Sequence, residues 1–235
     1  MMQQRFLGLA LLFLAGVLLA ACQQAGDSAY LPLVDYRVHT YDVRVSQGDN
    51  TQQQRQVVEI TGPHEADGQT IYLRNIGGRY QQALTREADG VYLIGDIPAQ
   101  TLRLFDEPAL LMPAEPAVGD TWQGLDYSRL LEWRKHALEH ADKSLHKPIN
   151  MQFECVATDE TVNTPAGRFH DVLRIEGTGE GRFELGAVRD LNRITIAVTH
   201  WYAPGVGLIK SERRESSDTG LLIAGEEKRV LQRYE

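Results

Sequence analysis

Short alternating runs separated by glycine-rich turns constrain the fold of this chain more than any other feature. Residues 34–38 alternate apolar and polar side chains, and Tyr41, Val43 and Val45 extend the alternation on one face. Further runs rich in β-branched or aromatic residues occupy 57–60, 70–73, 80–84 and 91–94. Gly-Asp-Asn, Asp-Gly or Gly-Gly sequences lie between them, at 48–50, 67–68, 77–78 and 89–90. This spacing is typical of antiparallel hairpins.

The second half of the chain continues the strand pattern. Strands are expected near residues 149–158, 169–177, 194–202, 206–215 and 221–233. The predicted strands do not alternate with helical segments, so a parallel sheet is not expected. Prolines cluster between the two halves and predict a loop-rich crossing over residues 98–118, at Pro98, Pro108, Pro113 and Pro116. We therefore predict a mainly β fold for residues 34–235, a single curved antiparallel sheet or an open β-barrel or sandwich of about ten strands.

One segment departs from the strand pattern. Apolar residues between 128 and 145 recur at helical spacing, at Leu130, Trp133, Ala137, Ala141 and Leu145. An alternating template matches fewer of these positions, so the count favours a short helix near 128–145.

The amino terminus has the pattern of an export signal. One arginine precedes an uninterrupted apolar and small-residue run over residues 6–21. This run is shorter than the roughly 20 residues that a membrane-spanning helix needs. A basic start, an apolar middle and small residues at the end predict a secretory signal peptide over residues 1–21.

The end of that run resembles the bacterial lipobox, with Leu19, Ala20 and Ala21 before Cys22. The resemblance implies cleavage between Ala21 and Cys22 and attachment of diacylglycerol and palmitate-type chains to Cys22. Two or more acyl chains hold a protein firmly on a bilayer. Lipoproteins with Asp after the cysteine tend to stay in the inner membrane, so Gln23 implies an outer-membrane location facing the periplasm. Residues 22–33 are then expected to form a lipidated tether.

Net charge limits the classes of partner that this chain could bind, and the cysteine content limits its thiol chemistry. The net charge of −8 argues against nucleic acid, which binds basic faces. Outer-membrane lipid, bound through the acylated cysteine, is the expected partner, together with an envelope protein. Cys155 lies in an alternating run with Ile149, Met151 and Phe153. We expect it to be a small buried hydrophobe rather than a reactive thiol.

One pattern matches a metal-dependent enzyme. His136, Glu139 and His140 have the H-x-x-E-H order of inverted zinc peptidases, and a helix would place both histidines on one face. Such an enzyme needs a further acidic ligand on a second helix, which the downstream sequence does not predict. A charged, solvated face is therefore favoured, with no metal, no cofactor and no catalytic residue. His146 would allow a looser surface cluster of three histidines.

Two motifs indicate turns between strands. Pro165, Gly167 and Phe169 predict a tight turn followed by a core residue. The second motif begins with two aromatic residues and ends in a proline-glycine turn, at Trp201, Tyr202, Pro204, Gly205 and Gly207. Core packing of the two aromatic rings is favoured over stacking on a ligand.

These two motifs resemble those of β-rich periplasmic proteins and lipoproteins called TapB-like, a family of unknown function. Its members pair a T/V-P-A-G-x-F turn with a later W/Y-Y-A-P-G-V-G-hydrophobic-V/I-K segment, present here at 164–169 and 201–210. The resemblance covers roughly residues 119–215 and implies no catalytic residue.

The sequence thus predicts a non-enzymatic outer-membrane lipoprotein whose periplasmic β domain is a binding or docking module. Two alternatives remain open. The domain is a carrier that shelters an acyl chain or another hydrophobic ligand on its concave face, which requires an apolar cavity of several hundred Å³. Otherwise it is a zinc-dependent hydrolase that uses His136, Glu139 and His140.

Overall fold

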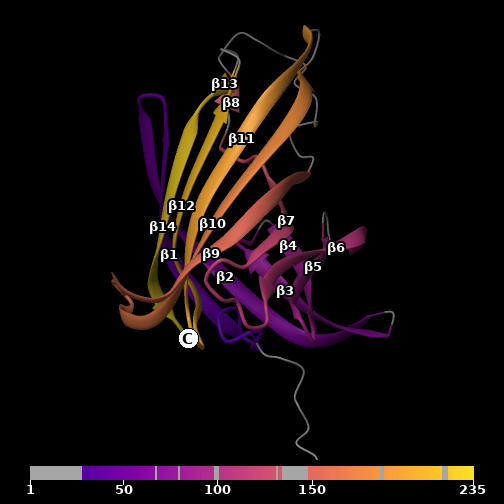
Figure 1. Cartoon of the computed structure of the whole chain (residues 1–235), viewed down its shortest axis with the longest axis vertical. Coiled ribbons are helices and arrows are strands. Elements are labelled where there is room, and N and C mark those ends of the chain that lie inside the picture. Colours follow the sequence, from indigo (N-terminus) through magenta and orange to yellow (C-terminus); the bar gives the residue numbers. More distant parts are fainter. Residues whose placement is uncertain are drawn as a thin grey trace, which may run out of the picture.

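A computed structural model describes residues 28–66, 68–78, 80–97, 101–130, 132–133, 148–185, 188–218 and 222–235. Twelve strands form one antiparallel sheet in the order β6-β5-β4-β3-β2-β1-β14-β12-β11-β10-β9-β7 (Figure 1). A separate two-stranded sheet joins β13 and β8. The predicted fold class, a single curved antiparallel sheet, is confirmed.

Most of the strands are long. The larger sheet contains β1 (Arg37–Gln47), β2 (Asn50–Ala66), β3 (Gln69–Ile76), β4 (Tyr80–Glu87), β5 (Gly90–Asp96), β6 (Arg103–Pro113), β7 (Thr121–Tyr127), β9 (Pro148–Thr164), β10 (Gly167–Leu185), β11 (Val188–Ala203), β12 (Gly207–Ser217) and β14 (Gly225–Tyr234). The smaller sheet contains β8 (Glu132–Trp133) and β13 (Leu222–Ile223).

The sheet curls until its two edge strands approach each other. A Cβ atom built on Gly124 of β7 would lie only 2.9 Å from the backbone oxygen of Leu110 in β6. No hydrogen-bonded pairing joins β6 and β7 in the described residues. The sheet therefore approaches a closed barrel without completing it. One face of every strand therefore points into a common interior.

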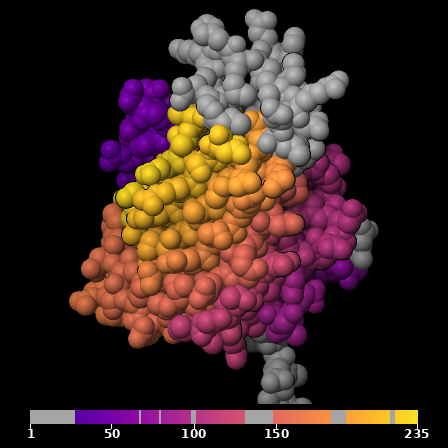
Figure 2. All heavy atoms as spheres, turned by 45° about the horizontal axis from the view of Figure 1, so that its top comes forward, coloured from indigo at the N-terminus to yellow at the C-terminus, as the bar shows by residue number. Residues whose placement is uncertain are grey.

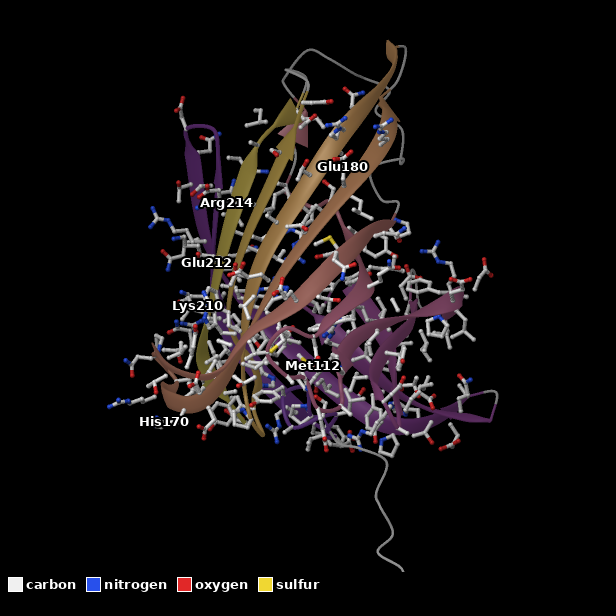
Figure 3. The ribbon with its side chains drawn as sticks, in the orientation of Figure 1. Met112, His170, Glu180, Lys210, Glu212 and Arg214 are labelled. Carbon is white, nitrogen blue, oxygen red and sulfur yellow. The ribbon has the colours of Figure 1, made fainter. Side chains whose placement is uncertain are left out.

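The outer face carries charged side chains at alternate positions. Lys210, Glu212 and Arg214 follow one another along β12 (Figure 3), and Lys210 Nζ lies 3.2 Å from Glu212 Oε1. The outer surfaces of the later strands form a continuous face in Figure 2. The alternation seen in the sequence is thus the inward and outward alternation of a curved sheet.

The largest core cluster lies on the inner face and joins strands from both ends of the sheet. Its buried members come from β2, β4, β5, β6, β7, β9 and β10 and from the segment before β1: Leu31, Leu33, Ile60, Leu84, Val91, Leu93, Ala109, Met112, Trp122, Cys155, Leu173 and Ile175. Burial of this cluster holds the two ends of the sheet together.

Residues 98–118 are not the loop-rich crossing that we expected. They contain β6, which pairs with β5. Pro108 lies within β6, and because β6 is an edge strand of the sheet, a missing backbone N–H need not break a ladder. The prediction was wrong because the proline count does not distinguish an edge strand from a loop.

Gly177, Gly179 and Gly181 form a glycine-rich sequence that lies within a strand and not in a turn. All three lie within β10. A Cβ atom on Gly177 would approach the Phe153 ring to 2.5 Å, so the missing side chain leaves room for that ring on the inner face. Gly177 therefore serves packing rather than a turn.

The predicted helix near 128–145 is not present in the residues that the structure describes there. Residues 128–130 have no helical structure, and Glu132–Trp133 pairs with Leu222–Ile223 as strand β8. Sheet pairing overrides the helical spacing at these two positions. The rest of the segment lies outside the described residues.

The start of the described chain packs against the sheet instead of forming a tether. Leu31 and Leu33 are buried in the core cluster, and the Gly205 amide donates to the Ala29 carbonyl oxygen at 2.7 Å. Residues 28–33 therefore pack as part of the folded domain.

Candidate functional site

A cavity of about 990 Å³ occupies the inner side of the curled sheet. Strands from both halves of the sheet, together with residues 31–32 and 128–130, contribute side chains to its wall. Its size is at the upper end of the range typical of small-molecule sites. The cavity is therefore the candidate functional site.

One part of the cavity wall is apolar. The Trp122 and Phe153 rings stack there with their centroids 5.8 Å apart. Other apolar side chains from the core cluster line the same part, namely Leu31, Ile60, Leu93, Leu125 and Ile175. This surface suits a hydrocarbon group.

A second part of the wall is polar and charged, and its Asp126 and Tyr127 are held from behind by Arg213 of β12, whose side chain is fully buried. Its Nη1 lies 2.5 Å from Asp126 Oδ2 and its Nε lies 2.6 Å from Glu215 Oε1. Its Nη2 donates to the Tyr127 carbonyl oxygen at 2.6 Å. Burial opposes the charge of Arg213, but the two carboxylates raise its pKa above the usual value.

Glu215 fixes the chain that follows β7. Its carboxylate accepts hydrogen bonds from the Ser128 hydroxyl at 2.8 Å and from the Arg129 and Leu130 amides at 3.1 Å. A carboxylate with charged and backbone donors is a strong acceptor. Arg213 and Glu215 thereby join β12 to residues 126–130 across the cavity wall.

Glu227 of β14 completes the charged part. Its Oε1 lies 3.0 Å from Arg129 Nη2 and 3.1 Å from Arg229 Nη2. Burial alone would raise the pKa of Glu227, but Arg129 and Arg229 hold it below the usual value. Asp126 behaves in the same way, because Arg213 and Arg129 outweigh its burial and lower its pKa.

Two histidines face the cavity in their neutral form. Burial lowers the pKa of His200 to about 3, and neighbouring arginines add to the effect. Its Nδ1 lies 3.0 Å from the Ser211 hydroxyl. Burial also lowers the pKa of His39, whose Nε2 donates to the Val206 carbonyl oxygen at 2.8 Å.

Arg74 of β3 differs from Arg103, Arg129 and Arg229 of the wall, which are paired with carboxylates. Its Nε and Nη2 donate to Gln82 Oε1 at 2.8 and 2.5 Å. Among the described residues, no carboxylate lies within ion-pair distance of its guanidinium, and burial lowers its pKa. Tyr41, Tyr80 and Tyr202 line the cavity with it.

Of the residues that define the predicted turn motifs, only Tyr202 and Gly207 line the cavity. Residues 165–166 form the turn between β9 and β10, and Gly167 has a φ of 143°. The side chain of Phe169 packs against a core cluster. Residues 204–206 form the turn between β11 and β12, where Gly205 and Gly207 also have positive φ.

Trp201 and Tyr202 point to opposite faces of β11. Trp201 lies on the outer face, where its Nε1 donates to Glu160 Oε2 at 3.0 Å and Lys210 Nζ lies 4.0 Å from the ring centroid. Tyr202 lines the cavity and packs against the core cluster. Only Tyr202 could contact a ligand in the cavity.

Cys155 is buried in the core cluster, as predicted. Burial raises the pKa of its thiol, and Asp120 adds to the effect. Its sulfur lies 3.8 Å from the Ala157 carbonyl oxygen. A buried, protonated thiol behaves as a small apolar group rather than a nucleophile.

Several predicted site residues lie outside the described part of the chain, namely Ala21, Cys22, His136, Glu139 and His140. Within the described ranges, no group of three His, Cys, Asp or Glu side chains could hold a metal ion. In those same ranges, no helix is long and apolar enough to cross a membrane.

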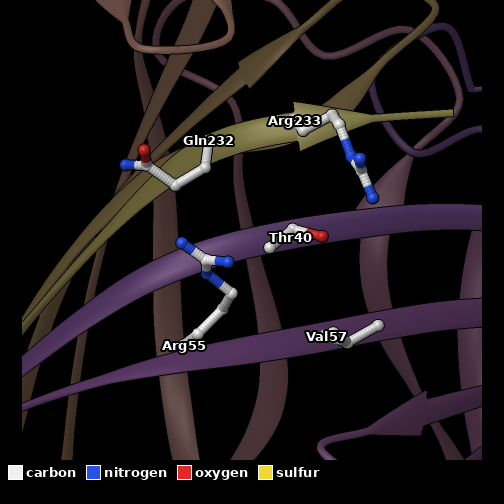
Figure 4. A pocket seen from close by; sticks show the side chains of 5 residues that line it. All are labelled: Thr40, Arg55, Val57, Gln232 and Arg233. Carbon is white, nitrogen blue, oxygen red and sulfur yellow. The ribbon is translucent and has the colours of Figure 1, made fainter.

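A shallow groove of about 350 Å³ lies on the outside of the sheet (Figure 4). Thr40, Arg55, Val57, Gln232 and Arg233 line it. It lies where the pairing of β1 with β14 shifts by one residue, between Thr40 and Tyr41. Its two arginines are exposed to water, and we assign no ligand to it.

Comparison with known proteins gives no family for this chain. No family model matches it, and no curated protein matches its sequence. A solved structure from Bacteroides fragilis, described as an exported protein with a YmcC-like fold, has 15% identity and a TM-score of 0.42. A Parabacteroides distasonis structure described as a lipoprotein has 13% identity and a TM-score of 0.41.

In both comparisons the match covers 88% of this chain and 98% of the other chain. Similarity at these TM-scores assigns neither a family nor a function. The resemblance to TapB-like proteins stays a prediction.

The charged residues of the cavity were missed in the sequence. Asp126 and Arg213 are 87 residues apart in the chain, and nothing in their linear spacing brings them together. One signal was present in β12, where Ile209, Ser211, Arg213 and Glu215 share a face. An apolar face that turns charged partway along one strand indicates a polar interior.

Proposed function

We propose that this chain is an outer-membrane lipoprotein whose periplasmic β domain carries a hydrophobic or amphiphilic ligand inside its sheet, without catalysing a reaction on it. The cavity of about 990 Å³ is the observation that carries this proposal. It favours the carrier alternative over a docking module, because a docking module needs a complementary outer surface and not an internal cavity.

The composition of the wall supports an amphiphile in particular. Aromatic and aliphatic side chains form one part of the wall, and ion pairs form another. Burying a hydrocarbon chain contributes about 0.8 kcal/mol for each methylene group. A polar head group would meet the charged part, where its hydrogen bonds could be satisfied.

The place of the anchor fits the same function. Leu31 and Pro32 line the cavity and follow Cys22 by nine and ten residues. The extended chain between Cys22 and Ser28 can span at most about 20 Å. An acylated Cys22 would therefore hold the domain close to the bilayer from which a lipid-like ligand would come.

The anchor is tested by cell fractionation with acyl labelling of the wild type and Cys22→Ala. We expect the wild type to be labelled and found in the outer membrane, and the variant to lose both properties. A Cys22→Ala protein that remains acylated and membrane-bound would contradict the anchor.

The cavity is tested by photo-crosslinking of the purified lipoprotein with a diazirine-bearing alkyl alcohol and peptide mapping by mass spectrometry. Ile76→Trp adds a large side chain to the cavity wall, whereas Val57→Trp adds one to the outer face of the neighbouring strand. We expect cross-links on cavity-wall peptides in the wild type and in Val57→Trp, and their loss in Ile76→Trp. Equal cross-linking in all three proteins would contradict the carrier function.

A further inference from the structure

The arginines of the cavity wall are not equivalent in their partners. Arg129 and Arg229 share Glu227, Arg103 lies 2.5 Å from Asp96, and Arg213, behind the wall, lies between Asp126 and Glu215. Each of these four charges is matched by a carboxylate, whereas Arg55 of the wall is exposed to water. Arg74 has only the neutral Gln82 amide oxygen as hydrogen-bond acceptor among the described residues.

The position of Arg74 joins the two parts of the wall. It lies opposite Ile60 in the β2–β3 pairing, and Ile60 belongs to the apolar core cluster. It also interacts electrostatically with Asp126 of the charged part, which is already bound to Arg213. Arg74 is deep within the molecule but retains surface open to the cavity. A group bound there would have hydrocarbon surface beside it.

Two donors of the wall lack acceptors. The Trp122 Nε1 and Arg229 Nε atoms have no hydrogen-bond partner in the part of the chain that is described. Both residues line the cavity, and their exposed fractions are only 7% and 8%. Buried donors are usually satisfied, so these two could accept a ligand that supplies acceptors.

One acceptor of the wall, Gln56 Oε1, is also unmatched. Rotation of its amide by 180° would present the NH₂ group at that position instead. It therefore does not oppose a ligand rich in acceptors.

We infer that the cavity takes amphiphiles with an anionic head group, a carboxylate or a phosphate, and that Arg74 binds this group. This inference rests on the proposed carrier function and adds the chemical class of the ligand. A buried cation without a counterion is costly, and a bound anion offsets that cost. The alkyl chain of the ligand then lies along the apolar part of the wall beside Ile60.

The test uses the processed lipoprotein in phosphatidylcholine nanodiscs and four short-chain probes: octanoate, octyl phosphate, octanol and octylamine. Binding is measured by calorimetry, with empty nanodiscs subtracted. We expect octanoate or octyl phosphate, or both, to bind the wild type at least about tenfold more tightly than octanol and octylamine. The comparison of octanoate with octyl phosphate distinguishes a carboxylate ligand from a phosphate ligand.

Variants test whether Arg74 causes the preference for anionic probes. Arg74→Gln should remove the preference for anions and leave octanol binding unchanged, and Arg74→Lys should retain part of the preference. Arg44→Gln removes the same charge from the exposed outer face of β1 and should behave as the wild type. Thermal melting of each variant shows that it is folded.

The outcomes separate the two proposals. Two results would overturn the role of Arg74. One is an undiminished preference for anions in folded Arg74→Gln. The other is a wild type that binds octanol as tightly as octanoate and octyl phosphate. If octanol binding persists in either case and is lost in Ile76→Trp, the carrier function stands. If none of the four probes binds the wild type, both proposals fail.

Discussion

At the scale of single residues, the interior of this protein contains ion pairs as well as apolar side chains. The Arg213 side chain is fully buried and bonded to two carboxylates and one carbonyl oxygen. Such pairs contribute little net stability relative to apolar residues, but breaking one of them leaves an uncompensated buried charge. Their effect is therefore largest when one partner is removed.

Arg213 and Arg214 offer a matched comparison on one strand. Arg213→Met should lower the free energy of unfolding by about 3–5 kcal/mol, because Asp126 and Glu215 lose their partner. Arg214 is on the outer face with its side chain 75% exposed, and Arg214→Met should change the free energy by less than about 1 kcal/mol. Urea unfolding of both variants measures the difference, and equal effects would contradict the buried network.

His200 should make the fold sensitive to mild acid. Its pKa is about 6.5 in the unfolded chain and about 3 in the folded protein. Between these values only the unfolded chain binds the proton, so stability is present above pH 6.5 and is lost as the pH falls. The loss approaches about 1.4 kcal/mol for each pH unit.

Between pH 6.5 and 5, the free energy of unfolding should fall less steeply with decreasing pH in His200→Gln than in the wild type. The expected difference in slope is about 1 kcal/mol per pH unit. Asp126 and Glu227, whose pKa values lie below normal, contribute to the slope only at lower pH. His170→Gln changes an exposed histidine and serves as the control. An unchanged slope in His200→Gln would show that folding does not lower the pKa of this histidine.

At the scale of the elements, alternation predicted most strands correctly because it reports which face of a strand is buried. The prediction from alternation failed at positions where an adjacent strand determines which residue type is tolerated. Pro108 is tolerated in β6 because that strand is at an edge, and Gly177 makes room for Phe153 from β9. Neither reason can be found without knowing which strands are adjacent. The same limit hid the charged cluster, whose members come from β7, β12 and β14 and the chain after β7.

The segment before β1 is an element that the sequence did not indicate. Leu33 is buried in the core cluster, whereas the next residue, Val34, is 40% exposed. Leu33→Ala should lower the free energy of unfolding by about 2–5 kcal/mol, and Val34→Ala by less than about 1 kcal/mol. Denaturant unfolding tests this. A Leu33→Ala protein as stable as Val34→Ala would mean that residues 28–33 are a tether after all.

At the scale of the whole molecule, one sheet produces both the fold and the site. Its curvature brings the edge strands β6 and β7 together and forms a cavity of about 990 Å³ that is partly open to solvent. The sequence predicted this architecture, but it could not predict what lines the interior, since inward positions of distant strands meet only in three dimensions. The proposed anchor at Cys22 and the proposed ligand both belong to the chemistry of lipids.

The most direct test of the carrier function is to extract and quantify the lipids that accompany the lipoprotein when it is purified from its own membrane. The account predicts about one non-covalent acidic amphiphile per chain in the wild type. It predicts a large decrease in Ile76→Trp, with unchanged covalent acylation of Cys22. Equal amounts of extracted lipid from the wild type and Ile76→Trp would contradict it.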